Sequence, residues 1–110
     1  MKLPSGHRAV IEDAKLREYI LNPAHPVGRH HAVLFERLLG ITCENAEVLK
    51  NALRLAAAEG EVSQERRTPH GRKYTIRFPM RGPEGLKTVL SIWIVETGSE
   101  IPRLVTSYVE

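Results

Sequence analysis

The chain has 110 residues, which is enough for one domain with a single modest hydrophobic core. Hydrophobic residues make up 42% of it and charged residues 26%, a balance that is typical of folded globular proteins and excludes an intrinsically disordered chain. The net charge of +3 is too small to identify a partner by itself, so the places where charges gather along the chain matter more.

The beginning of the chain predicts a short lead-in followed by a helix. Residues 3–11 are expected to be extended or a short strand. Asp13 is predicted to cap a two-turn helix over residues 14–21. The Asn22-Pro23 pair ends this helix, because proline lacks a backbone donor and restricts the residue before it.

Two longer helices are predicted next. Over residues 29–39 the apolar residues recur close to the i, i+3, i+4, i+7 pattern of a half-buried helix. Gly28 can act as its N-cap and Gly40 as the left-handed residue that ends it. A third helix is predicted over about 45–59, with an apolar face made of Val48, Leu49, Ala52, Leu53, Leu55 and Ala56.

After Gly60 the period of the apolar pattern changes from 3.6 to 2, which indicates strands. In the second predicted strand Tyr74, Ile76 and Phe78 alternate with polar residues and should share one face. The predicted strands cover about 62–67, 73–78, 86–96 and 103–109, with turns at 68–71, 81–85 and 97–102.

This order of elements predicts an α+β fold, because the helices and the strands are segregated along the chain. We expect a single domain over residues 1–110. Three N-terminal helices, over about 13–60, would pack on a four-stranded antiparallel meander over about 61–110.

The start of the second predicted helix has an unusual charge pattern. Arg29, His30 and His31 fall in its first turn, where free backbone N–H groups and the positive end of the helix dipole favour an anion. The same dipole favours a neutral imidazole, which can accept a proton. His25 lies just before, in a rigid loop between two prolines. The cluster indicates a phosphate site, although for each histidine alone a structural role is an equal alternative.

A basic hairpin follows the helices. Six cations and no acid lie between residues 66 and 83, namely Arg66, Arg67, Arg72, Lys73, Arg77 and Arg81. Such charges either keep an edge strand from aggregating or form a surface for a polyanion, for which phosphate contact is the better explanation. In the last strand Thr106 and Tyr108 share a face, and their hydroxyls could donate to phosphate oxygens; β-propensity alone also explains them.

Several chemistries have no counterpart in the sequence. It contains no GxxxxGK[ST], GxGxxG, GxSxG or HExxH motif, and Asp13 is its only aspartate. Cys43 is the only cysteine and is expected to be a half-buried residue before a helix, so it offers neither a disulfide nor a multi-cysteine zinc site. We therefore expect no cofactor and no metal, and what remains is acid–base chemistry on a phosphodiester.

The stretch LREYILNPAHPVGRHHAVLFERLLGIT, together with the final IPRLVTSYVE, resembles a bacterial domain family found as small stand-alone proteins and at the C-termini of large secreted toxins. The order of elements and the LVTxY strand are also similar to the barnase–EndoU–colicin–RelE group of ribonuclease toxins. In that group a helical layer packs on an antiparallel sheet whose cleft cuts RNA without a metal. The family's helix start reads Gly-Arg-His-Lys-Ala, so His31 stands here in place of a lysine.

The resemblance implies a catalytic site made of His25, Arg29, His30, Thr106 and Tyr108. The leading hypothesis is a metal-independent endoribonuclease, the toxin of a toxin–antitoxin or toxin–immunity pair, in which a histidine (His30 first, His25 second) takes the 2′-OH proton. The RNA-binding residues would be His31, Arg66, Arg67, Arg72, Lys73 and Arg77.

The partners expected are RNA, such as tRNA or mRNA, and an acidic cognate antitoxin or immunity protein. The alternative is a non-catalytic α+β module that binds a partner protein or nucleic acid through the same basic face. The N-terminal residues lack the apolar core of a signal peptide, so we expect a cytoplasmic protein with no membrane association, or one delivered to a target-cell cytoplasm as part of a longer secreted chain.

Overall fold

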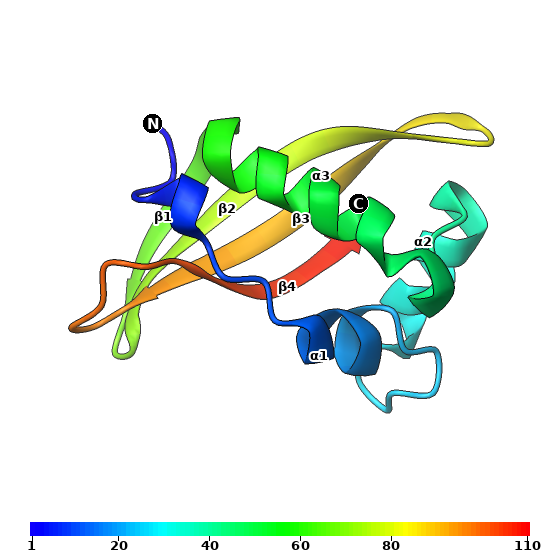
Figure 1. Cartoon of the computed structure of the whole chain (residues 1–110), viewed down its shortest axis with the longest axis horizontal. Coiled ribbons are helices and arrows are strands. Elements are labelled where there is room, and N and C mark those ends of the chain that lie inside the picture. Colours follow the sequence, from blue (N-terminus) through cyan, green and yellow to red (C-terminus); the bar gives the residue numbers. More distant parts are fainter.

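A computed structural model describes all residues from 1 to 110 and has three helices followed by four strands, which confirms the predicted fold class (Figure 1). The first helix continues into a π-helical turn, and two short 3₁₀ turns precede the first and third helices. The bounds are α1 (Asp13–Lys15, continued by the turn Leu16–Ile20), α2 (Arg29–Leu39), α3 (Ala46–Glu59), β1 (Val62–Thr68), β2 (Gly71–Gly82), β3 (Gly85–Glu96) and β4 (Arg103–Val109), with 3₁₀ turns at Gly6–Arg8 and Cys43–Asn45.

The four strands form one antiparallel sheet in the order β1-β2-β3-β4, which is the predicted meander. Strands β2 and β3 are its long central pair, and they run further than the alternation predicted. Their register continues to Gly82, which pairs with Gly85, so only two residues form the turn between them. The expected turn over 81–85 is therefore shorter than predicted.

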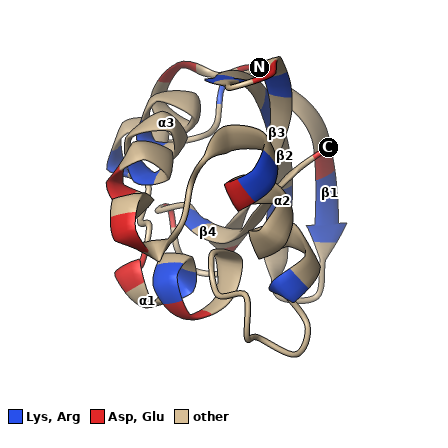
Figure 2. Cartoon of the chain, turned by 90° about the vertical axis from the view of Figure 1, so that its right-hand side faces the viewer, with Lys and Arg blue, Asp and Glu red and all other residues tan.

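Helices cover only one face of this sheet. In Figure 2, α1 and α3 lie on one side of the strands, and α2 lies in front of them, at the end of the sheet that is on the right in Figure 1; no helix lies along the opposite side. The covered face holds the core, and Tyr74, Ile76 and Phe78 all point into it, as predicted. The uncovered side is called the open face below.

A buried tryptophan and a buried serine form a hydrogen-bonded link between the two central strands under the helices. Trp93 is fully buried and donates from Nε1 to Ser91 Oγ at 2.9 Å. Ser91 Oγ in turn donates to the carbonyl oxygen of Ile76 at 2.8 Å. Both polar groups are thus paired inside the core, which avoids the cost of burying an unpaired donor.

Helix α2 docks through a narrow apolar stripe. Phe35 is fully buried, and Ala32 and Leu39 are buried on the same side. Gly28 is the N-cap and Gly40, with φ of 68°, is the left-handed C-cap, as predicted. The end of the helix approaches β2 so closely that a Cβ on Gly82 would lie 2.1 Å from the Leu38 carbonyl oxygen. At the other end of the helix, the first turn of α2 lies beside the C-terminal part of β4, where His31 meets Tyr108.

Three local expectations are wrong. Glu12 precedes α1, and Asp13 is no cap; its carboxylate instead pairs with Arg17 at 2.9 Å and with Lys50 at 3.8 Å. Val48 and Leu55 of α3 are 49% and 60% exposed, because the helix presents only its narrower stripe to the sheet. The lead-in contains a 3₁₀ turn, and its only bridges are isolated ones, from Lys2 to Glu61 and from Val10 to Arg103. None of the helices has the length and apolar character needed to cross a membrane.

Replacement of Phe35 tests the docking of α2. We expect Phe35→Ala to lower the free energy of unfolding by about 3–5 kcal/mol, because it leaves a cavity at the centre of the stripe. Val33 lies on the same helix but is 46% exposed, so Val33→Ala should stay within about 0.5 kcal/mol of the parent. Urea denaturation of the three proteins measures both values, and an equal effect of the two substitutions would contradict this packing.

Candidate functional site

The open face carries side chains that the pairing register arranges in rows across the strands. Paired residues of an antiparallel sheet point to the same side. One row runs from Arg77 of β2 through Leu90 of β3 to Tyr108 of β4. The next row runs from Thr75 to Thr106. Arg66 pairs with Lys73 in a third row, so cations and hydroxyls lie next to one another on this face.

The first turn of α2 meets β4 through two stacked rings. The His31 imidazole lies on the Tyr108 phenol ring, with centroids 4.7 Å apart and an angle of 25° between the planes. The Nδ1 atom of His31 is buried and has no hydrogen-bond partner, the only side-chain nitrogen or oxygen of the chain in that state. A buried imidazole nitrogen without a partner costs free energy of folding, because the nitrogen has lost its contact with water.

An arginine on β2 completes this corner of the open face. Arg77 donates from Nε to Glu110 Oε1 at 2.8 Å and from one terminal nitrogen to Ser63 Oγ at 3.0 Å. The hydrogen bond to the Glu110 carboxylate raises the pKa of the Arg77 guanidinium, and the nearby Tyr108 contributes in the same direction. Arg77 therefore places a guanidinium, whose charge Glu110 partly balances, close to Tyr108.

A groove of about 290 Å³ lies beside this corner on the open face. Its floor and walls come from all four strands. The residues that line it are Gln64, Arg66, Lys73, Thr75, Ile92, Val105 and Thr106. Arg66 and Lys73 have no acidic partner, unlike Arg77, so their charges are available to a ligand. Three of the predicted site residues, Arg66, Lys73 and Thr106, thus meet in one place.

Other predicted residues lie elsewhere. His25 is half-buried, and its Nδ1 accepts hydrogen bonds from the backbone N–H groups of Val27 and Gly28, both at 3.0 Å. Its ring also meets the Tyr19 ring edge-on, so His25 orders the loop before α2. Arg29 and His30 are exposed, without a hydrogen-bond partner. At about 100° per residue, Arg29 points away from the flank of α2 that carries His31.

The basic hairpin is divided between the two faces of the sheet. Arg67 pairs with Arg72 in register, on the side that bears the helices, and Arg72 forms an ion pair with Glu65 at 3.3 Å. Only Arg66, Lys73 and Arg77 of the predicted RNA-binding cations face the open side. The division follows from the alternation of neighbouring residues within β1 and β2, whose register is regular from the Thr68–Gly71 pair to the Gln64–Thr75 pair.

Sequence reasoning missed four residues of this region. Ser63 and Glu110 hold Arg77, and Gln64 and Ile92 line the groove. The alternation of β2 predicted which of its side chains face the open side, but no sequence signal predicted the bulge in β1. Glu110 stands opposite Arg77 only because β4 is two strands away in the sheet, which requires the complete topology.

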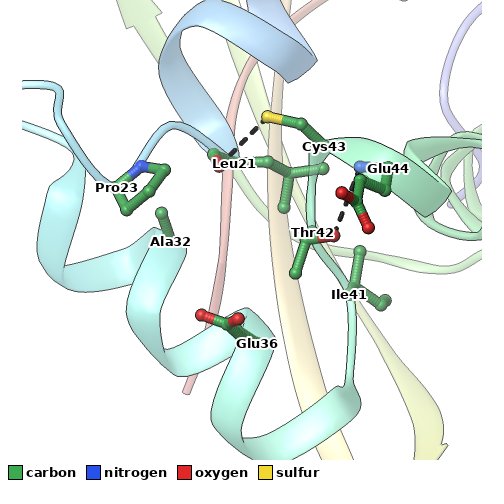
Figure 3. A pocket seen from close by; sticks show the side chains of 8 residues that line it. All are labelled: Leu21, Pro23, Ala32, Glu36, Ile41, Thr42, Cys43 and Glu44. Carbon is green, nitrogen blue, oxygen red and sulfur yellow. Dashed lines mark hydrogen bonds between the residues drawn. The ribbon is translucent and has the colours of Figure 1, made fainter.

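A second cavity, of about 280 Å³, lies on the other flank of α2, between this helix and the turn before α3 (Figure 3). Glu36 and Glu44 line it together with apolar side chains, so it disfavours a phosphate. Cys43 is half-buried there, as predicted, and its thiol donates to the carbonyl oxygens of Arg17 and Leu21, both at 3.3 Å. No group of three or more His, Cys, Asp or Glu side chains is arranged to hold a metal ion.

Comparison with known proteins supplies the family. A family model described as "Domain of unknown function (DUF6883)" matches residues 2–110. The chain belongs to the DUF6883 family. No curated protein sequence matches this DUF6883 chain.

Among solved structures, one chain of a contact-dependent growth inhibition toxin–immunity protein complex from Klebsiella pneumoniae 342 is similar to this DUF6883 protein, with a TM-score of 0.69 and 17% sequence identity. The match covers 92% of this chain and 99% of that chain. At this identity the likeness shows a shared fold.

The ring stack gives a direct prediction in solution. The ring current of Tyr108 should shift the His31 ring protons upfield, and Tyr108→Phe should keep this shift whereas Tyr108→Ala should abolish it. Loss of the stacked pair should also lower the free energy of unfolding by about 0.5–1.5 kcal/mol, in addition to the effect of the lost buried apolar area. NMR spectra of the histidine ring protons measure the shift, and an unchanged His31 signal in Tyr108→Ala would contradict the contact.

Proposed function

We propose that this DUF6883 protein is a metal-independent endoribonuclease and acts as the toxin of a toxin–immunity pair. The observation that carries the proposal is the His31–Tyr108 stack at the edge of a helix-free, cation-bearing sheet face. An imidazole, a phenol and a guanidinium within one corner supply the acid, base and charge that cleavage of a phosphodiester needs.

The proposed reaction is an internal transesterification. His31 removes the proton of the ribose 2′-OH, and the oxygen attacks the adjacent phosphorus in line. The bond from phosphorus to the 5′-oxygen breaks, and Tyr108 protonates the leaving oxygen or relays a proton to it. Arg77 offsets the charge that develops on the non-bridging oxygens. The products carry a 2′,3′-cyclic phosphate and a 5′-hydroxyl.

The contacts favour His31 over His30 as the base. His31 stacks on a predicted site residue, whereas His30 is exposed and contacts none of them; because Nδ1 of His31 is buried, Nε2 is the nitrogen that would take the proton. His25 already uses Nδ1 to hold two backbone N–H groups. In this proposal His31 takes the role first expected of His30, and the histidine that stands in place of the family's lysine is itself the base.

The charge distribution supports the toxin role over the immunity role. The similar solved chain belongs to a complex whose two components are a toxin and an immunity protein. The present chain is basic overall, and Arg66 and Lys73 lie unpaired on its open face. A polyanion fits such a surface, and so does an acidic immunity protein that covers it. We propose RNA as the substrate and an acidic immunity protein as the partner.

Cleavage by histidine variants tests the enzyme. We expect the parent protein to cut total RNA and a labelled tRNA in the presence of EDTA, and His31→Ala to lose about 10²–10⁴-fold in rate because the base is gone. His30→Ala, one residue away, should keep most of the activity. Gel analysis with detection of cyclic-phosphate ends measures both. A loss in His30→Ala with none in His31→Ala would restore the first assignment and contradict the present one.

Charge reversal on each face tests the RNA surface. We expect Arg66→Glu with Lys73→Glu to weaken RNA binding, and to lower the slope of log affinity against log salt by about 0.7 for each lost phosphate contact. Arg67→Glu with Arg72→Glu makes the same change of charge on the helix-bearing face and should leave the slope unchanged. Filter binding between low and moderate salt measures the slopes. Equal effects on both faces would mean that the open face holds no RNA.

A further inference from the structure

We propose that the groove on the open face is a subsite for one unpaired nucleobase of the RNA, next to the point of cleavage. This inference rests on the proposed function and names the form of the substrate, which is single-stranded RNA. The groove is called the base groove below. It lies next to the His31–Tyr108 pair, since Thr106, which lines the groove, and Tyr108 are neighbours on the same face of β4.

The floor of the base groove is apolar although no helix covers it. Ile92 and Val105 line it and are only half-buried. Apolar side chains left open to water in the middle of a polar sheet face mark a place where an apolar partner surface is expected. The face of a nucleobase is such a surface, and a groove of about 290 Å³ has room for one base.

Polar groups without partners surround this floor. The side chains of Gln64, Thr75 and Thr106 line the groove and make no hydrogen bond within the protein. An amide and two hydroxyls offer both donors and acceptors, which is what the edge of a base requires. Arg66 and Lys73 stand on the β1 side and can hold the phosphate that follows the base.

The position of the base groove makes it part of a continuous RNA path. Two residues of a strand span about 7 Å, so Thr106 lies about that far from Tyr108. The nucleotide held in the groove is therefore a neighbour of the one whose phosphate reaches His31 and Tyr108. A base that is paired in a duplex cannot enter the groove, because its edge is already occupied. The site is thus built for single-stranded loops or ends.

The test measures base-dependent binding without cleavage. The probes are fluorescent pentanucleotides of adenosine and of uridine with 2′-O-methyl groups, which block attack, and matched probes with an abasic central position. We expect at least one base-bearing probe to bind the parent protein about tenfold more tightly than its abasic match, since the ring face leaves water. Fluorescence anisotropy gives the dissociation constants.

Variants identify the groove as the source of the difference. Gln64→Ala, on the exposed edge strand, and Ile92→Ala, on the floor, should reduce the difference to within about twofold while abasic binding stays unchanged. Asn51→Ala removes an exposed amide on α3 and should keep the full difference. Thermal melting checks that each variant is folded; if Ile92→Ala unfolds, Gln64→Ala decides alone.

The outcomes separate this inference from the proposed enzyme. Equal binding of base-bearing and abasic probes, or an undiminished difference in Gln64→Ala, overturns the base groove. If the parent cleaves RNA but shows no base dependence, the enzyme stands and the base groove is wrong. If the parent binds in a base-dependent way but does not cleave RNA in EDTA, the base groove stands and the proposed reaction is wrong.

Discussion

The alternation of side chains across β2 and β3 is the constraint on which the rest of the structure depends. It directs Tyr74, Ile76 and Trp93 to the covered side, where the helices bury them. The same alternation sends Lys73 and Arg77 to the side that no helix covers, because a charged side chain is costly to bury without a partner. The open face and its charge are thus consequences of how the core is built. A shift of register by one residue would exchange the two sets.

The fold could be predicted from the sequence because its signals are local. The change of apolar period after Gly60 separates helices from strands, and Gly28 and Gly40 bound α2 within one residue. What could not be predicted depends on packing between elements. The exposure of Leu55 depends on which stripe of α3 packs on the sheet, and Asp13 meets Lys50 only after α1 and α3 have packed. Neither the exposure of Leu55 nor the Asp13–Lys50 contact can be predicted from a local sequence pattern.

The candidate site was predicted in part for the same reason. Thr106 and Tyr108 were expected to share a face because that follows from the period of a strand, and they do. The choice among three histidines depends on the rotation of α2, where one residue changes the direction by about 100°. Packing of Phe35 sets that rotation, and it turns His31 onto Tyr108 while His30 faces solvent. The division of the hairpin cations between two faces follows from the alternation of β1 and β2, whereas no sequence signal marked the bulge in β1 at which Ser63 meets Arg77.

A crystal structure with an RNA that carries a single 2′-deoxy substitution at the cleaved nucleotide would test the central claim most directly. The substitution removes the attacking oxygen, so the substrate stays intact in its site. The account predicts that the RNA crosses the open face over Lys73, with the uncleaved phosphate within hydrogen-bond distance of His31 and of the Tyr108 hydroxyl. An RNA bound on the helix-bearing face, or a phosphate held by Arg29 and His30 with His31 still stacked and untouched, would contradict it.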